Sequence, residues 1–523
     1  KRFGSGVVKI ANIYEGLSTE KAILTMTEMK KGTPIIINGI LHNYKNNTFG
    51  IPDIIVRSDY LNKICKLDSI DEEYTKKGCK YSDNWHYLII DIKFTTLNFY
   101  KNDNNIKKDG SIESYKAQVM IYNDAIGQLQ GYTPEYIFLL GRRIREDNQK
   151  FDAFYKMGKV EPFKKDIDTY NKTTRAIKWI KKLKSTGNKW NIKNSNISEL
   201  FPNMNNKSDY PWHSLKKEVS SENKEITSLW FCGPKQRELA NKKNIKSWKN
   251  KKLNGDLFNF KNDKKKIFDK ILKTNRGDIL FNPPKITKKQ NSTIYNLLSK
   301  EPMEFYIDFE TANGLHDSFE SVINFTKNDN LLILDRSENL IYMIGVGYTH
   351  PKTNKWIYNV FIVDRLSFDC EKKIIQNWIN YMDDICLKFN YYDSPKMYHW
   401  SSAEPSLLNK AIKYHNMKFN LNWVDLLQIF KKVPITVKGS LNFGLKNIAQ
   451  SMFNNKLIKT RWTDSSIDGL SAMLVAWYSE HDCKKGHIKK LSDHESMNEI
   501  VEYNEIDCKV MWDILKYIRT NVL

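Results

Sequence analysis

The hydrophobic pattern consists of short unbroken apolar runs, which predict buried strands, and of apolar residues at helical spacing, which predict helices. In the N-terminal part, helices are predicted at 18–30 and 115–130, and strands at 34–41, 50–57, 87–95 and 135–140. In the C-terminal part, strands are predicted at 305–307, 340–348 and 356–363, a strand end and a helix start within 397–408, and a helix over 502–515. Residues 150–300 are less regular, with a Lys-rich helix predicted at 174–184.

Two acidic residues end the strand that begins at Phe305. Asp308 and Glu310 are two positions apart, so in an extended strand their side chains share a face. Two converging carboxylates must hold a cation, share a proton or repel each other. Because hard divalent cations bind carboxylate oxygens readily, the pair is a candidate metal site.

Further candidate residues follow in the C-terminal part. Glu404 opens a helix after a predicted strand, and Tyr503 and Asp507 are four apart, on one face of a helix. The ordered set resembles the DEDD exonucleases of the RNase H-like superfamily, in their tyrosine-bearing branch, over about residues 301–523. The resemblance implies that Asp308, Glu310, Glu404 and Asp507 hold two Mg²⁺ or Mn²⁺ ions and that Tyr503 orients the attacking water. Glu404 stands where the family usually has Asp.

Three more residues of this part have weaker assignments. Asp425, in NWVDLLQIF, is a competing acid that we expect to support the site rather than bind metal. Lys446, in KGSLNFGLKNIAQSM, resembles a lysine of RecB-associated exonuclease domains and is expected to contact substrate phosphate. His399 is expected to be structural.

The N-terminal part has a second ordered set, with Asp53 and Asp91 on successive strands, Lys93 beyond them, and Gln118 and Tyr122 one helical turn apart. This order resembles the RecB-like branch of the PD-(D/E)XK nucleases over about residues 15–145. The resemblance implies that the two aspartates bind one or two Mg²⁺ or Mn²⁺ ions and that the lysine positions or deprotonates water. The glutamine and tyrosine would orient the lysine and the DNA backbone.

The RecB-like family often adds a ligand from the preceding helix, and Glu28 is the candidate here. A helix, a Gly-Pro turn and a second helix are expected within 225–248, which faintly resembles a helix-hairpin-helix element without its G-x-G hairpin. Aromatic residues among the lysines of 242–273 either stack bases or are buried by a helix, and burial is the commoner outcome.

Charge is unevenly distributed along the chain. The formal net charge is +23, and residues 151–300 hold 35 Lys and Arg against 14 Asp and Glu. A lysine-rich composition from codon bias would enrich the whole chain, so the asymmetry favours a surface for a polyanion.

The seven cysteines show no C-x-x-C pair, which argues for a reducing compartment and against zinc or iron–sulfur sites. The chain has no apolar run of 18 or more residues and no signal-peptide pattern, so a soluble intracellular protein is expected, with no membrane partner.

The two resemblances imply an α/β fold in which residues 1–148 form a RecB-like PD-(D/E)XK domain with a mixed sheet and helices. Residues 149–300 are expected to form a basic, mainly helical connector that binds nucleic acid. Residues 301–523 are expected to form an RNase H-like exonuclease domain with a five-stranded sheet. The implied function is a metal-dependent DNA nuclease with two sites. The alternatives are an RNA-processing nuclease and a nucleic-acid-binding scaffold without catalysis.

Overall fold

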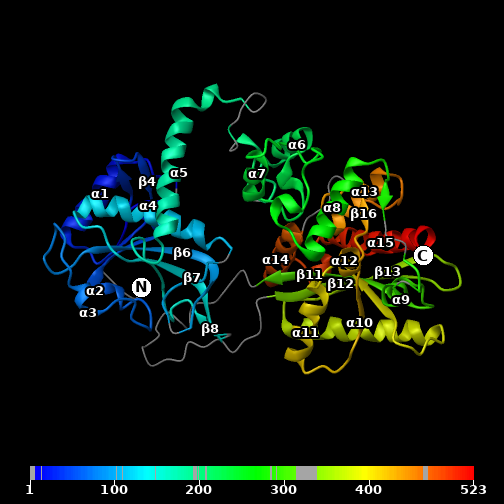
Figure 1. Ribbon diagram of the computed structural model, residues 1–523. Coiled ribbons are helices and arrows are strands. Elements are labelled where there is room, and N and C mark those ends of the chain that lie inside the picture. The colour runs from blue at the N-terminus through cyan, green and yellow to red at the C-terminus, as the bar shows by residue number, and fades with distance from the viewer. Residues whose placement is uncertain are drawn as a thin grey trace. The chain divides into compact units, whose positions relative to one another are not determined.

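The computed structural model describes residues 6–12, 14–101, 103–108, 110–147, 149–191, 197, 200–206, 209–282, 286–289, 291–313, 339–462 and 469–523. The described residues form two compact units, unit 1 up to Trp190 and unit 2 from Asn191 onward (Figure 1). None of the described helices combines the length and the hydrophobicity that a membrane span requires. Each unit is a mixed α/β structure.

Unit 1 is built on a mixed sheet in the order β1-β2-β5-β6-β7-β8, with β9 also paired to β7. β1 and β2 are parallel, as are β6 and β7, whereas β5 is antiparallel to both of its neighbours. The strands are β1 (Val7–Lys9), β2 (Ile35–Ile37), β5 (Ile54–Arg57), β6 (Tyr87–Asn98), β7 (Ile137–Glu146), β8 (Gln149–Asp152) and β9 (Gly158–Val160).

Alternating residues of these strands bury both faces of the sheet. Ile89 and Leu139 pack in one core with α1 and α4, while Leu88 and Phe138 pack in another with α2 and α3. The other elements of unit 1 are α1 (Thr19–Lys31), β3 (Leu41–Asn43), β4 (Thr48–Gly50), α2 (Ser58–Leu61), α3 (Glu72–Thr75), α4 (Ile112–Gln130) and α5 (Ile167–Thr186).

The segment expected as one strand at 34–41 is two strands. β2 ends at Ile37, and the chain turns at Asn38, whose φ of 53° is left-handed. The backbone N–H of Asn38 then donates to the carbonyl of Asp53. Because Asn tolerates this conformation better than most residues, the apolar run continues through a turn that its hydrophobicity does not reveal.

Unit 2 contains a five-stranded sheet in the order β13-β12-β11-β14-β15, which confirms the predicted strand number. The first three strands are antiparallel, and β14 and β15 run parallel to β11. The strands are β11 (Glu304–Asn313), β12 (Asn339–Thr349), β13 (Trp356–Ile362), β14 (Lys396–His399) and β15 (Asn422–Asp425).

The sides of β11 face different helices. Phe305, Ile307 and Phe309 pack in a core with α10 and α14, whereas Tyr306 packs in a second core with α15. The further elements of unit 2 are α6 (His213–Asn223), α7 (Pro234–Asn241), α8 (Asn262–Arg276), β10 (Phe281–Asn282), α9 (Ser292–Leu298), α10 (Phe368–Lys388), α11 (Ala403–His415), α12 (Leu426–Lys432), β16 (Thr436–Val437), α13 (Leu445–Asn454), α14 (Gly469–Lys485) and α15 (Met497–Asn521).

The segment expected as a connector is divided between the two units. Helix α5 belongs to unit 1, and residues from Ile226 onward share a core with α12, α13 and α15. Phe258 and Phe268 are buried there, so these aromatic residues pack in the protein.

The two helices expected within 225–248 are reduced to one. A 3₁₀ turn at Ile226–Ser228 replaces the first, and α7 begins at Pro234. Leu229 and Cys232 are buried, and the N–H of Trp230 donates to the carbonyl of Leu441. Trp230 and Leu441 are far apart in sequence, so helical spacing alone does not reveal their contact. This contact and the restriction that Pro234 places on the backbone of Gly233 favour an irregular segment over a helix.

Candidate active site

Strand β11 places two carboxylates on the side that faces α15. Asp308 and Glu310 alternate with the apolar residues of the other face, and a register shift follows Glu310. Gly345 of β12 lies opposite Asp308. A Cβ added to this glycine would lie 1.7 Å from Oδ1 of Asn504, so the bare backbone makes room for a side chain of α15.

Helix α15 completes the cluster. Carboxylate oxygens of Asp308, Glu310 and Asp507 all lie within 4.8 Å of one another, the arrangement expected from the sequence. Glu310 and Asp507 are buried, and Asp308 is partly buried. Three anionic groups this close destabilise one another unless a cation or protons neutralise them.

Burial and mutual repulsion shift the protonation of the cluster. Burial, followed by the charge of Asp507, raises the pKa of Glu310 to about 8, and burial raises the pKa of Asp507 to about 7. The pKa of Asp308 also lies well above its ordinary value, because of burial first and then the charges of Asp507 and Glu310. The positive charge of Lys446 lowers all three pKa values, yet each stays well above its ordinary value.

Tyr503 and Lys446 lie beside the carboxylates. Burial, followed by the charge of Asp507, raises the pKa of the Tyr503 phenol, which therefore stays protonated at neutral pH. Nζ of Lys446 lies 4.6 Å from the centre of the Tyr503 ring and 5.8 Å from that of Trp462. An exposed cation is thus held at the edge of the acidic cluster.

Glu404 is a neighbour of the cluster rather than one of the three converging carboxylates. Its charge raises the pKa of Asp308, but its Oε2 lies 3.4 Å from Nδ1 of His399. Both of these atoms are buried, and neither has a hydrogen-bond partner among the described residues. Asp425 has a structural role, since it accepts hydrogen bonds from the N–H groups of Ser401 and Gln428 at the start of α12.

Sequence reasoning missed Asn504. Its side-chain amide donates to Oδ2 of Asp308 at 2.7 Å, and its oxygen accepts from the hydroxyl of Tyr358 at 2.9 Å. The residue is fully buried on α15 in the stripe that includes Ile500, Cys508 and Met511. A polar residue at the spacing of this apolar stripe, three positions before Asp507, is the signal that could have identified it.

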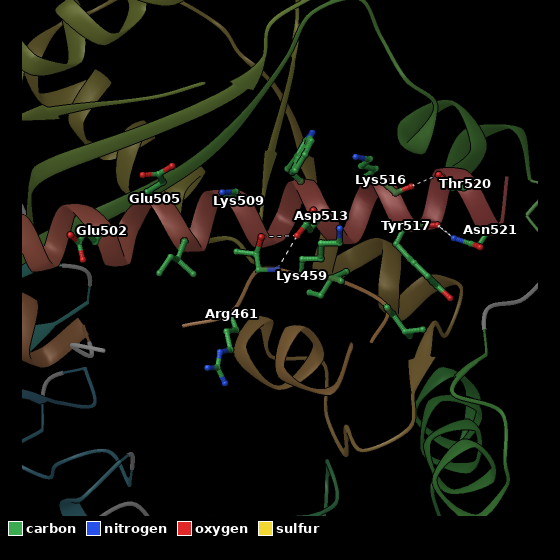
Figure 2. A pocket seen from close by; sticks show the side chains of 15 residues that line it. Lys459, Arg461, Glu502, Glu505, Lys509, Asp513, Lys516, Tyr517, Thr520 and Asn521 are labelled. Carbon is green, nitrogen blue, oxygen red and sulfur yellow. Dashed lines mark hydrogen bonds between the residues drawn. The ribbon is translucent and has the colours of Figure 1, made fainter. Parts of the chain in front are cut away.

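A groove of about 870 Å³ lies between α15 and the segment 457–461 (Figure 2). Its basic lining residues include Lys459 and Arg461 from that segment and Lys509 and Lys516 from the helix. Of its acidic residues, Asp513 accepts hydrogen bonds from the backbone and hydroxyl of Thr460.

The candidate residues of unit 1 also meet. Ile54 lies opposite Ile90 in the antiparallel pair, so Asp53 and Asp91 are neighbours. Oδ2 of Asp53 accepts from the N–H of Ile92 at 2.6 Å. Burial raises the pKa of Asp91 to about 6. The close contact with the Lys93 ammonium opposes this rise, whereas the charge of Asp53 adds to it.

A chain of contacts connects this pair to α4. Lys93 Nζ donates to Oε1 of Gln118 at 2.8 Å, and Nε2 of Gln118 donates to the hydroxyl of Tyr122 at 2.6 Å. A Cβ on Gly50 would lie 2.0 Å from the Tyr122 ring, so the glycine admits this ring. The carboxylate of Glu28 instead accepts hydrogen bonds from Lys31 and Thr33 at the end of α1.

The residues of the unit 2 cluster fit a divalent cation. Three carboxylates converge, their pKa values are raised, and an unpartnered buried oxygen of Glu404 lies nearby. A hard cation that prefers oxygen ligands would relieve the repulsion and lower these pKa values.

A family model described as RNase_H superfamily matches residues 333–519, and the described part of this range, from Asn339 onward, lies within unit 2. The C-terminal part of the chain is therefore an RNase H-like domain, with a nuclease-type fold. The match begins after Asp308 and Glu310, which the sheet pairing connects to the matched strands. Comparison with curated proteins and with solved structures gave no match to the chain.

Proposed function

We propose that the chain is a metal-dependent nuclease that hydrolyses phosphodiester bonds of DNA, with a 3′–5′ exonuclease site in unit 2 and a RecB-like PD-(D/E)XK site in unit 1. The observation that carries the proposal is the convergence of Asp308, Glu310 and Asp507 inside an RNase H-like domain. Divalent cations held by these carboxylates would activate the attacking water and stabilise charge on the leaving oxygen.

The remaining residues of unit 2 have supporting tasks in this proposal. The protonated hydroxyl of Tyr503 orients the attacking water, because it lies on the same helical face as Asp507. Asn504 holds the carboxylate of Asp308 in one orientation, and Lys446 attracts the substrate phosphate. Glu404 is the proposed fourth metal ligand, which requires its carboxylate to turn from His399.

In unit 1, Asp53 and Asp91 are the proposed metal ligands, and Lys93 positions the water and offsets charge on the phosphate. Gln118 and Tyr122 orient the lysine, and their contact chain supports this role. The partial neutralisation of Asp91 by Lys93 leaves a site with less negative charge than the cluster in unit 2.

The test replaces one acid in each site, Asp308→Asn and Asp91→Asn, and follows 5′-end-labelled DNA in Mg²⁺. The unit 2 variant is expected to lose the ladder of 3′-shortened products and to keep internal cleavage, and the unit 1 variant is expected to do the reverse. Asp393→Asn, at an exposed position, is the control for loss of one carboxylate.

The same assay separates the alternatives. Faster cleavage of RNA than of DNA of the same sequence would replace DNA with RNA as the substrate. Absence of cleavage of either polymer in Mg²⁺ or Mn²⁺ would contradict the enzyme and leave a nucleic-acid-binding scaffold.

A further inference from the structure

Helix α5 of unit 1 carries positive charge that its own fold does not neutralise. Its only acidic residue is Asp168, and its basic residues are Lys172, Arg175, Lys178, Lys181, Lys182 and Lys184. Lys172 pairs with Glu113 of α4 at 2.5 Å. The other five basic residues form no ion pair with any residue that the structure describes.

Only the first part of α5 is packed. Lys116 of α4 forms a buried ion pair of 2.7 Å with Asp166 at the helix start, and the hydroxyl of Tyr170 donates to Asp124 of α4 at 3.2 Å. Thr173 is the last buried residue of the helix. The rest of α5 extends away from the sheet of unit 1 (Figure 1). Residues 174–186 are therefore a helical segment with little tertiary support.

The charges of this free segment oppose its helical structure. Lys178 is three and four positions from Lys181 and Lys182, spacings at which like charges repel across one helical turn. A short helix without packing is already marginal in water. A polyanion along this face would remove the repulsion and stabilise the helix, because its charges match those that the protein leaves unpaired.

The apolar side of the segment helps to decide what binds. A basic amphipathic helix suits either an anionic membrane surface or a nucleic acid. The Trp179 ring lies 6.0 Å from that of Trp190, so the chain after α5 folds back over part of the apolar side. Because the same chain contains an RNase H-like domain, nucleic acid is the favoured polyanion.

We propose that the free segment of α5, residues 174–186, binds the sugar–phosphate backbone of DNA through the ammonium and guanidinium groups of Arg175, Lys178, Lys181, Lys182 and Lys184. The choice of DNA rests on the proposed nuclease function, whereas the site rests on the unpaired charge and the missing packing. Helix α4, on which the first part of α5 packs, also carries Gln118 and Tyr122, so the helix with the binding segment is anchored to a helix that carries two residues of the unit 1 site.

The experiment measures binding of the full chain to a fluorescein-labelled single-stranded DNA of 30 nucleotides by anisotropy, in EDTA and over a range of salt concentrations. One variant combines Lys178→Gln, Lys181→Gln, Lys182→Gln and Lys184→Gln, since Gln is a good helix former. The matched control combines Lys9→Gln, Lys30→Gln, Lys45→Gln and Lys108→Gln, four exposed lysines of unit 1 with the same total charge.

The α5 variant is expected to bind at least about 10-fold more weakly and to lose about 3 units of the slope of log affinity against log salt, since each phosphate contact contributes about 0.7. The control is expected to lose less than about 1 unit of that slope. Equal slopes for the two variants would overturn the proposal. Hydrogen exchange of residues 174–186 in the unmodified chain should slow when DNA is added, and no slowing would also overturn it.

Further arms identify the polyanion. If the chain binds anionic phosphatidylserine vesicles and DNA does not displace them, the proposal is overturned in favour of a membrane surface. Poly-glutamate that competes as well as DNA at equal charge would overturn it in favour of an acidic protein, and tighter binding of RNA would overturn the choice of DNA. EDTA removes the divalent cations that the proposed cleavage requires, so a protein that is inactive in Mg²⁺ but binds DNA through α5 in EDTA contradicts only the proposed nuclease function.

Discussion

Asn504 donates a 2.7 Å hydrogen bond to the carboxylate of Asp308 and thereby joins the last helix of the chain to the central strand of the sheet in unit 2. Its oxygen is occupied by the hydroxyl of Tyr358 from β13. The amide therefore has one orientation, with its donor toward Asp308. In a cluster of carboxylates that repel one another, this hydrogen bond fixes the orientation of the Asp308 carboxylate.

Replacing this amide should weaken the metal site. Asn504→Leu keeps the volume but leaves Asp308 and Tyr358 without their partner, so the Mg²⁺ concentration for half-maximal cleavage should rise about 10- to 100-fold. The free energy of unfolding should fall by about 1–3 kcal/mol. Asn498→Leu, at an exposed position of the same helix, is the control. An unchanged Mg²⁺ dependence would show that Asp308 is oriented without the amide.

Gly345 is predicted to be coupled to Asn504. An added Cβ would lie 1.7 Å from Oδ1 of Asn504, so Gly345→Ala should destabilise the folded chain by about 1–3 kcal/mol in urea unfolding. In an Asn504→Ala background the same change should cost less, because the clashing atom is gone. Gly469→Ala, whose Cβ would have no neighbour within 4 Å among the residues that the structure describes, should have little effect. Strictly additive effects would contradict this coupling.

The raised pKa values predict how stability depends on pH without metal. Burial raises the pKa of Glu310 from 4.5 to about 8, and that of Asp507 from 3.8 to about 7. Their stabilising contribution is fully present below pH about 4 and is lost as the pH rises through about 7–8, because the unfolded chain releases these protons first. The protein in EDTA should therefore become less stable over this range.

Thermal unfolding in EDTA and in Mg²⁺ between pH 5 and 9 measures this effect. Mg²⁺ should add most stability at high pH and should release protons when it binds below pH about 8. In Glu310→Gln the decline of stability with pH in EDTA should be smaller, since one buried acid is removed. A decline as steep as in the unmodified chain would indicate that other groups cause it.

Tyr503 is predicted to act on the reaction and not on metal binding. Tyr503→Phe keeps the ring over which Lys446 lies and removes only the hydroxyl. Exonuclease turnover should fall about 10- to 100-fold through loss of water positioning, while the Mg²⁺ dependence stays the same. The control is Tyr478→Phe, at an exposed position of α14. A shifted Mg²⁺ dependence would instead assign the hydroxyl to the metal site.

Lys93 gives a prediction that concerns unit 1 alone. Lys93→Met removes the cation that lowers the pKa of Asp91, so this pKa should rise above about 6. Internal cleavage should be lost, and the 3′ ladder should remain. Lys108→Met, at an exposed position, controls for the loss of one charge. Loss of both activities would mean that the two sites do not work separately.

The sequence predicted the parts of the site that depend on local spacing. Asp308 and Glu310 share a strand face, and Tyr503 and Asp507 share a helix face. The periodicity of a strand or a helix was therefore enough to predict that the two members of each pair lie together. The role of Asn504 was not predictable in this way. It depends on Gly345, which lies opposite Asp308 on a different strand and leaves room for the amide.

Contacts between distant segments also explain the expectations that differ from the structure. The segment after Glu225 has helical spacing, yet Trp230 bonds to Leu441 and a 3₁₀ turn forms instead. The assignment of Glu404 as the fourth ligand remains a prediction, and in the structure its Oε2 lies 3.4 Å from Nδ1 of His399. The division of the chain into three domains remains a prediction, since buried residues such as Phe268 join part of the basic segment to the core of unit 2.

Near the other end of α15, Arg519 binds both carboxylate oxygens of Glu304, at 2.6 and 2.8 Å, on the first residue of β11. Helix α15 and strand β11 are thus connected by side-chain hydrogen bonds at two places, between Arg519 and Glu304 and between Asn504 and Asp308. Arg519 lies about three helical turns from Asp507, so its contact with Glu304 also helps to set the distance between Asp507 and the acids of β11. A substitution of Arg519 should therefore lower the proposed activity although Arg519 contacts none of the acids of the cluster. Mutagenesis confined to the acidic cluster would miss this position.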